Sequence, residues 1–140
     1  MADECILVFE LEPAVPFTVA NGSAGTNIEK GALMEIADPF TVGAATGDDC
    51  KVIGIAAEEK IGGDGKTAMG VYMRGIFKGT AGASGVTVGR AIICDEGTGS
   101  ENEMVVGDAN SEGIIGTALE TATDRETFLF LLNPINPVLA

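Results

Sequence analysis

Two stretches of this 140-residue chain follow the same order of residue types, and this repetition limits the folds that the chain can adopt. The first is KVIGIAAEEKIGGDGKTAMGVYMRG, residues 51–75, and the second is EGIIGTALETATDRETFLFLLNP, residues 112–134. Each has an aliphatic-Ile-Gly step, continues through alanine and glutamate, crosses a polar turn and ends in an apolar segment. Such a repeat predicts two similar structural units that share one hydrophobic core.

A second pair of anchors supports the duplication. A basic residue beside a glycine precedes an apolar run that ends in aspartate, first around Gly31 and again around Gly89, 58 positions later. The glycines of the Ile-Gly steps, Gly54 and Gly116, are 62 positions apart, and an insertion in the intervening loop explains the difference. Alternatively, short apolar-glycine strings recur by chance in a chain with 20 glycines. The shared order and spacing of both pairs favour duplication.

The residue types within the repeats predict a β protein. Segments with two glycines and several β-branched residues are poor helices, whereas short apolar runs between turn residues are typical of strands. We expect pseudo-repeats at about residues 27–79 and 85–134, each with about three strands. Because so few strands cannot cover their own apolar face, the two units should pack together. The expected fold is mainly β with little helix, a small barrel or sandwich that forms a domain over residues 27–140.

Residues 1–26 differ from the rest and are expected to form an extended N-terminal arm. Pro13 and Pro16 exclude a helix and argue against a central strand. Short strands are expected at residues 6–11 and 17–20, before a turn-forming NGSAG segment. The arm either reaches a partner, or its first segment forms an edge strand of the protein's own barrel.

The charge of the chain restricts its partners. There are 21 acidic and 8 basic residues, which give a formal net charge of −13. Such a surface repels the phosphates of nucleic acids and anionic lipids, so we expect neither nucleic-acid nor membrane partners. No apolar run approaches the ~20 residues of a membrane helix, and the N-terminus lacks the basic segment of a signal peptide. Cys5, Cys50 and Cys94 are interpreted as small buried apolar residues in a reducing environment, not as disulfides or metal ligands.

No recognisable arrangement of catalytic or ligand-binding residues is present in the sequence. The chain has no histidine, the commonest general base and zinc ligand. The GGDGKT segment, residues 62–67, ends like a phosphate-binding loop, but Lys60 stands where the first glycine is needed and a strand is expected to follow. A calcium-like spacing that begins at Asp108 has Leu119, not glutamate, at its twelfth position. We expect no enzymatic activity, no cofactor and no bound metal.

The order of several segments resembles the small capsid decoration (head-stabilising) proteins of tailed bacteriophages. In that family an apolar-Gly-apolar-Ala strand is followed by a hairpin and by a strand that runs into Gly-apolar-Phe. The matching segments here are FTVA at 17–20, Lys30-Gly31, VIGIAA at 52–57 and VYMRGIF at 71–77, with a second round at 88–93 and 115–120. The similarity spans about residues 15–133, and the longer N-terminal segment, residues 1–12, departs from it.

The resemblance implies a virion protein, made in the host cytoplasm, that binds the major capsid protein lattice on the outside of an icosahedral head and stabilises it. It also implies self-association, commonly as a homotrimer at local three-fold positions. The residues expected to contact the partner lie in the arm: Phe9, Leu11, Pro13, Val15, Pro16 and Phe17.

An alternative is a non-enzymatic β module that binds a host surface or a glycan, as a fibre or adhesin does. Sugar stacking needs exposed aromatic rings. The chain has one tyrosine, six phenylalanines and no tryptophan, and most of the phenylalanines lie in apolar runs. The composition therefore favours the capsid.

Overall fold

The computed structural model describes residues 3–19, 27–45, 51–95, 102–107 and 113–135, which form eleven strands and no helix. The strands are β1 (Ile6–Glu10), β2 (Val15–Val19), β3 (Leu33–Asp38), β4 (Thr41–Ala44), β5 (Val52–Ala56), β6 (Ala68–Tyr72), β7 (Gly75–Ala81), β8 (Ala91–Cys94), β9 (Glu103–Val106), β10 (Ile114–Ala118) and β11 (Thr127–Ile135). The expected fold class, mainly β with a barrel architecture, is confirmed.

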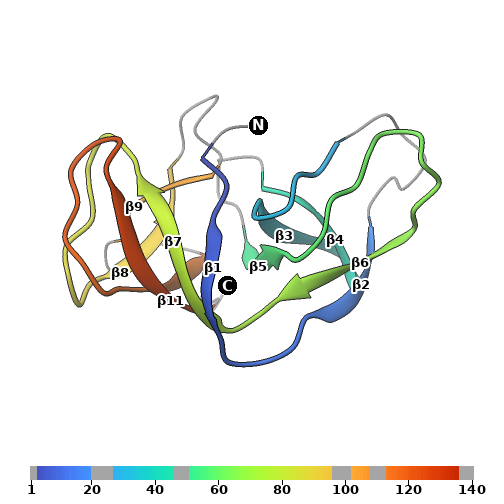
Figure 1. The fold of residues 1–140 in the computed structure, drawn as a ribbon, viewed down its shortest axis with the longest axis horizontal. Coiled ribbons are helices and arrows are strands. Elements are labelled where there is room, and N and C mark those ends of the chain that lie inside the picture. Colours follow the sequence, from blue (N-terminus) through green and yellow to red (C-terminus); the bar gives the residue numbers. More distant parts are fainter. Residues whose placement is uncertain (1–2, 20–26, 46–50, 96–101, 108–112, 136–140) are drawn as a thin grey trace.

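The strands close into two barrels that lie side by side (Figure 1). The first barrel has the strand order β2-β4-β3-β5-β6. The second has the order β7-β11-β10-β8-β9 and closes where β9 pairs with β7. Each barrel contains one parallel pair, β2 with β4 or β7 with β9, and its other pairs are antiparallel. The two barrels therefore have the same topology.

Equivalent positions of the two barrels are separated along the chain by the same numbers of residues as the repeated glycines. An isolated bridge joins Ile28 to Lys60 beside the first barrel, and another joins Val86 to Ala122 beside the second. The first members of the two bridges are 58 positions apart and the second members are 62 positions apart. The structure differs from the expectation in one respect. Each unit contains five strands rather than about three, so each closes a barrel by itself.

The residues predicted as an arm contribute two strands. β1 pairs with β7 of the second barrel, with Ile6 opposite Lys78, and forms the edge strand of that sheet. β2 is a strand of the first barrel, between β4 and β6. The chain therefore crosses from one barrel to the other between β1 and β2 (Figure 1).

Pro16 lies inside β2, although a missing N–H argues against a barrel strand. The N–H of Thr18 donates to Phe40 on the β4 side, whereas the N–H of Val19 donates to Thr67 on the β6 side. Successive N–H groups alternate along a strand, so the nitrogen of Pro16 faces the β4 side. The β4 ladder reaches only Thr18 and Val19. Pro16 is tolerated because no partner strand needs its N–H.

The two barrels share a hydrophobic core. One buried cluster fills the second barrel around Phe77 and Phe130, and it continues into the first barrel. The first-barrel members of this cluster are Leu33, Ala45, Val52 and Ile55. A buried hydrogen bond of 3.0 Å, from the N–H of Leu33 to Oδ1 of Asn102, also joins the first barrel to the segment that leads into β9. The barrels are thus parts of one folding unit.

The repeated glycines lie where two strands approach too closely for a side chain. A Cβ atom on Gly54 would lie 2.2 Å from the carbonyl oxygen of Tyr72, and one on Gly116 would lie 1.8 Å from that of Leu131. Both are contacts with backbone atoms of the neighbouring strand, which cannot move aside as a flexible side chain can. The Ile-Gly step of each repeat is therefore required for the β5–β6 and β10–β11 pairs to form.

The cysteines differ from the expectation in part. Cys5 is free and buried, and its burial raises the pKa of the thiol to about 12. Cys94 is disulfide-bonded, so the prediction of a reduced side chain is wrong for this residue. Cys50 lies outside the described residues. Spacing along the chain could not reveal the disulfide, because the fold decides which thiols come together.

We predict that Gly116→Ala lowers the free energy of unfolding by roughly 3 kcal/mol or more, since the added methyl collides with the backbone of Leu131. Chemical denaturation would measure the loss. Gly70→Ala is the control, because its Cβ would meet its nearest neighbour, the Cβ of Ala14, at 3.2 Å. Equal losses in the two variants would contradict the steric explanation.

Candidate partner-binding surface

The predicted contact residues divide between the surface and the core. Four of them are exposed: Phe9, Leu11, Pro13 and Pro16. Phe17 is only 4% exposed and packs in the core of the first barrel, and the half-buried Val15 packs against the same core. The structure therefore places the exposed members on β1, on the connection to β2 and at the start of β2.

Two further apolar residues, Ile6 and Val8, extend this surface, and the sequence analysis did not single them out. Ile6 and Phe9 are each 63% exposed, and Val8 and Leu11 are also exposed. A bulge in the β1–β7 ladder between Leu7 and Phe9 interrupts the alternation of faces along β1, so the residue pattern alone could not show which side chains face outward. We call Ile6, Val8, Phe9 and Leu11 the β1 surface.

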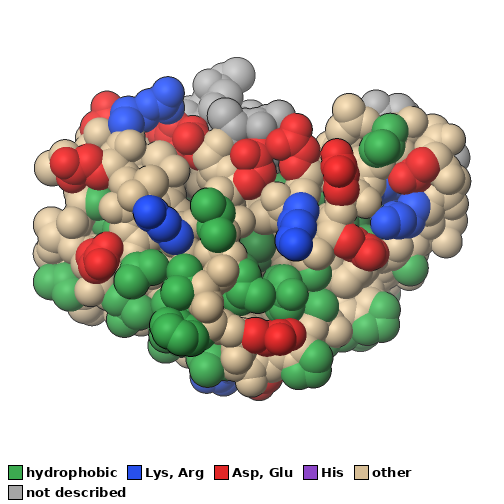
Figure 2. All heavy atoms as spheres, viewed as in Figure 1, with side chains coloured by type: hydrophobic (Ala, Val, Ile, Leu, Met, Phe, Trp, Pro, Cys, Tyr) green, Lys and Arg blue, Asp and Glu red, His purple; other side chains and the backbone are tan. Residues whose placement is uncertain are grey.

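Figure 2 shows hydrophobic side chains gathered over the lower half of the face that carries β1. Acidic side chains lie mainly above them on this face. Among the described strands, β1 pairs only with β7. The backbone N–H and C=O groups along its other edge therefore pair with none of these strands. An exposed apolar edge strand is a typical site for pairing with another chain.

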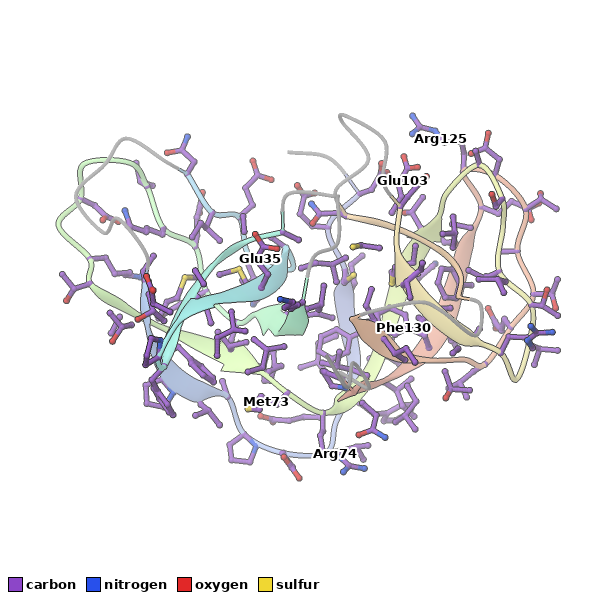
Figure 3. The ribbon with its side chains drawn as sticks, turned by 180° about the vertical axis from the view of Figure 1, so that it is seen from behind. Glu35, Met73, Arg74, Glu103, Arg125 and Phe130 are labelled. Atoms are coloured by element: carbon purple, nitrogen blue, oxygen red, sulfur yellow. The ribbon has the colours of Figure 1, made fainter. Side chains whose placement is uncertain are left out.

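Backbone and charged contacts fix the segment before β1 to both barrels. The N–H of Cys5 donates to the carbonyl oxygen of Gly31 at 2.8 Å, which attaches the segment to the first barrel. Arg125 forms ion pairs with Asp3, at 3.7 Å, and with Glu103, which attach it to the second. Figure 3 shows Glu103 and Arg125 together at one end of that barrel.

Two pairs of carboxyl groups meet in the same region. Burial raises the pKa of Glu103, and a hydrogen bond with Asp3 raises it further, although Arg125 opposes the change. Burial and a hydrogen bond with Glu29 likewise raise the pKa of Glu4. The same bond lowers the pKa of Glu29.

The segment that ends like a phosphate-binding loop is a turn between the antiparallel strands β5 and β6, and a strand follows it, as predicted. Asp64 accepts hydrogen bonds from the N–H groups of Lys66, at 2.8 Å, and Ile61, at 3.0 Å. These bonds, the one from Lys66 foremost, lower the pKa of Asp64. The side chain of Lys60 is fully buried, and its Nζ lies 3.5 Å from Oδ1 of Asp64. The residues of this segment therefore stabilise their own turn.

In the described part of the chain, no group of three or more cysteine or acidic side chains is arranged to hold a metal ion. Residues 108–112, the first five positions of the calcium-like spacing, lie outside that part. None of the described residues belongs to a helix long and apolar enough to cross a membrane.

Comparisons with known proteins give a match in structure alone. No protein-family model matches the chain, and no curated protein matches it. The fold is similar to that of a solved structure described as the head fiber gp8.5 N base in bacteriophage phi29. The TM-score is 0.57 at 18% sequence identity, over 85% of this chain and 93% of the other. The two chains share a fold. That neighbour is a component of a phage head, as are the decoration proteins that the sequence resembles.

We predict that the two phenylalanines of the predicted contact segment affect stability very differently. Phe17→Ala should lower the free energy of unfolding by about 3 kcal/mol or more, because it empties a core position. Phe9→Ala should change it by no more than about 0.5 kcal/mol, because the ring is mostly in solvent. Urea denaturation of both variants measures the difference, and similar losses would show that Phe9 is part of the core.

We predict that Glu103 makes the protein less stable as the pH rises. Because its pKa is higher in the folded chain than the ordinary value of 4.5, its contribution is fully present below that value and is lost as the pH rises through the folded pKa. Glu103→Gln should therefore lose less stability than the wild type between pH 4.5 and neutrality. Denaturation at several pH values tests this, and parallel curves for the two proteins would refute it.

Proposed function

We propose that this chain is a structural protein of a phage virion that decorates and stabilises the outside of an icosahedral head by binding the major capsid protein lattice. The observation that carries the proposal is the fold shared with a phage head fibre base, which covers most of both chains. The resemblance of the glycine-containing repeats to capsid decoration proteins was found from the sequence and leads to the same class.

The physical properties of the chain suit such a role. A decoration protein needs no catalytic chemistry and must only bind the assembled lattice better than it binds free subunits. Such binding stabilises the assembled state by roughly 4 kcal/mol when the free protein is at about 1,000 times its dissociation constant. The β1 surface, continued by Pro13 and Pro16, supplies an apolar contact area of this kind.

We propose further that the chain acts as a homotrimer on the head. Three linked copies bind through a high effective concentration, so contacts that are weak individually hold the complex in place. The net charge of −13 would keep unattached molecules apart until they meet the lattice.

The test is thermal rupture of heads. We predict that saturating amounts of the purified chain raise the rupture temperature of mature, undecorated heads of the phage that encodes it. The measurement is the temperature at which a dye gains access to the packaged DNA. The Phe9→Ala variant, which preserves the fold, should raise the rupture temperature less than the wild type does. A rupture temperature unaffected by saturating wild-type protein would overturn the proposal.

A further inference from the structure

A polar pocket lies on the second barrel, beside the bridge between Val86 and Ala122. Two segments line it, residues 83–87 before β8 and residues 121–124 between β10 and β11. Its volume is about 260 Å³, below the roughly 300–1,000 Å³ of pockets for drug-sized ligands. The pocket therefore suits a small occupant, of the size of a single sugar residue.

The first barrel contains the same turn 62 positions earlier, between β5 and β6. There the carboxylate of Asp64 accepts a hydrogen bond from the N–H of Ile61 at 3.0 Å. In the second barrel the carboxylate of Glu126 accepts one from the N–H of Thr123 at 2.8 Å. Both the donors and the acceptors are 62 positions apart, so the two turns can be compared residue by residue.

One hydrogen bond of the first turn is missing from the second. In the first barrel the N–H of Gly62 donates to Oδ1 of Asn27 at 2.7 Å. Asp124 is 62 positions after Gly62 and Gly85 is 58 positions after Asn27, which are the offsets of the two bridges. Gly85 has no side chain, and the N–H of Asp124 has no acceptor within the described structure. The second barrel therefore lacks the amide oxygen that the first provides from its own chain.

Residue 85 cannot supply the missing group. Its φ angle is 70°, and a Cβ atom there would lie 2.8 Å from the carbonyl oxygen of Ala122. Both conditions favour glycine. Gly85 and Asp124 both line the pocket, so an acceptor for the N–H of Asp124 can enter from solvent. By comparison with the first barrel, that acceptor is the carbonyl oxygen of an amide.

The other polar groups of the lining suit a molecule with several hydroxyl groups. The hydroxyls of Ser84 and Thr87 have no partner within the described structure. The hydroxyl oxygen of Thr121 accepts a hydrogen bond from the N–H of Val88 at 3.1 Å, so its own proton remains to be donated. The carboxylate of Asp124 can only accept. Sugar hydroxyls both donate and accept and can pair with all of these groups, whereas an asparagine side chain would leave most of them unpaired.

The charge around the pocket excludes an anionic ligand. Asp124 lines the pocket, and hydrogen bonds from the backbone and side chain of Thr123 lower the pKa of the adjacent Glu126. Both carboxylates are therefore ionised at neutral pH. Arg125 lies between them in the sequence, but its side chain forms its ion pairs with the N-terminal segment and with β9. A neutral ligand is favoured.

We propose that this pocket binds an N-acetylated sugar. Its acetamido oxygen accepts from the N–H of Asp124, as the amide oxygen of Asn27 does from Gly62, and its ring hydroxyls bond to Thr87 and to the Asp124 carboxylate. Hydrogen bonds hold the sugar, so the site needs no aromatic ring, and none lines it. The inference goes beyond the proposed function, because the second barrel would carry this site whether or not the chain is attached to a head.

Titration with free sugars, followed by amide NMR, tests the acceptor. N-acetylglucosamine should shift the amide signal of Asp124, and glucose, which lacks the acetamido group, should bind at least about fivefold more weakly. Equal affinity for the two sugars, or an unchanged signal of Asp124, would overturn the proposal. Tighter binding of N-acetylasparagine amide than of N-acetylglucosamine would also overturn it, and would assign the pocket to a side chain of a protein partner.

Removal of one hydroxyl tests the lining. Thr87→Val should weaken the binding of N-acetylglucosamine by about fivefold. Thr67→Val is the matched control, because Thr67 is an exposed threonine of the first barrel that does not line the pocket. The control should bind like the wild type, and both variants should keep the wild-type unfolding midpoint. Equal affinities of the two variants would contradict the proposed site.

The rupture temperature of heads separates this inference from the proposed function. Thr87→Val should raise that temperature as much as the wild type does, because the pocket is not part of the β1 surface. Loss of sugar binding with normal stabilisation of heads would support both proposals. If the wild type binds no sugar but still stabilises heads, the pocket proposal fails and the proposed function stands.

Discussion

The packing of the first barrel against the second is the interaction on which the rest of the structure depends. Leu33, Val52 and Ile55 belong to strands of the first barrel, yet they lie in the same buried cluster as Phe77 and Phe130 of the second. A five-stranded barrel of this size has little interior, so residues on its outer side must also be removed from water. The neighbouring barrel provides that cover, so each duplicated unit buries apolar residues of the other.

The N-terminal segment depends on this arrangement. Cys5 lies in the shared cluster and is attached through its N–H to the first barrel, while β1 continues along the second. The strand thus covers the junction of the two units and presents Ile6 and Phe9 to solvent. A surface built across the junction exists only when both barrels are folded and packed. This couples the proposed partner contact to the integrity of the whole molecule.

Much of the fold could be predicted from the sequence, because glycine carries steric information. The Ile-Gly steps at Gly54 and Gly116 correspond to places where a neighbouring backbone excludes any Cβ atom, and their spacing revealed the duplication. The strand that follows the GGDGKT segment was also predicted, and the side chain of Asp64 stabilises the turn before that strand by accepting hydrogen bonds from nearby N–H groups. Pro16 was interpreted less well. Whether Pro16 disrupts the strand depends on which neighbouring strand its nitrogen faces, and the sequence does not show this.

The contact surface was predictable only in part. Phe9 and Leu11 were expected at the surface and are exposed, but Phe17, in the same predicted segment, is a core residue of the first barrel. The residue types are alike, and the difference arises because β1 is an edge strand with a bulge, whereas β2 is closed on both sides over part of its length. Whether an apolar side chain is a contact or a core residue is decided by its neighbours in space.

The sequence by itself determined the β character, the duplication and the positions at which only glycine fits, because these follow from local sterics and from periodicity along the chain. Only the tertiary structure decided that each unit closes its own barrel, that β1 joins the second barrel instead of the first, and that Cys94 is disulfide-bonded. These features depend on contacts between residues far apart in the chain, which local sterics and periodicity do not specify.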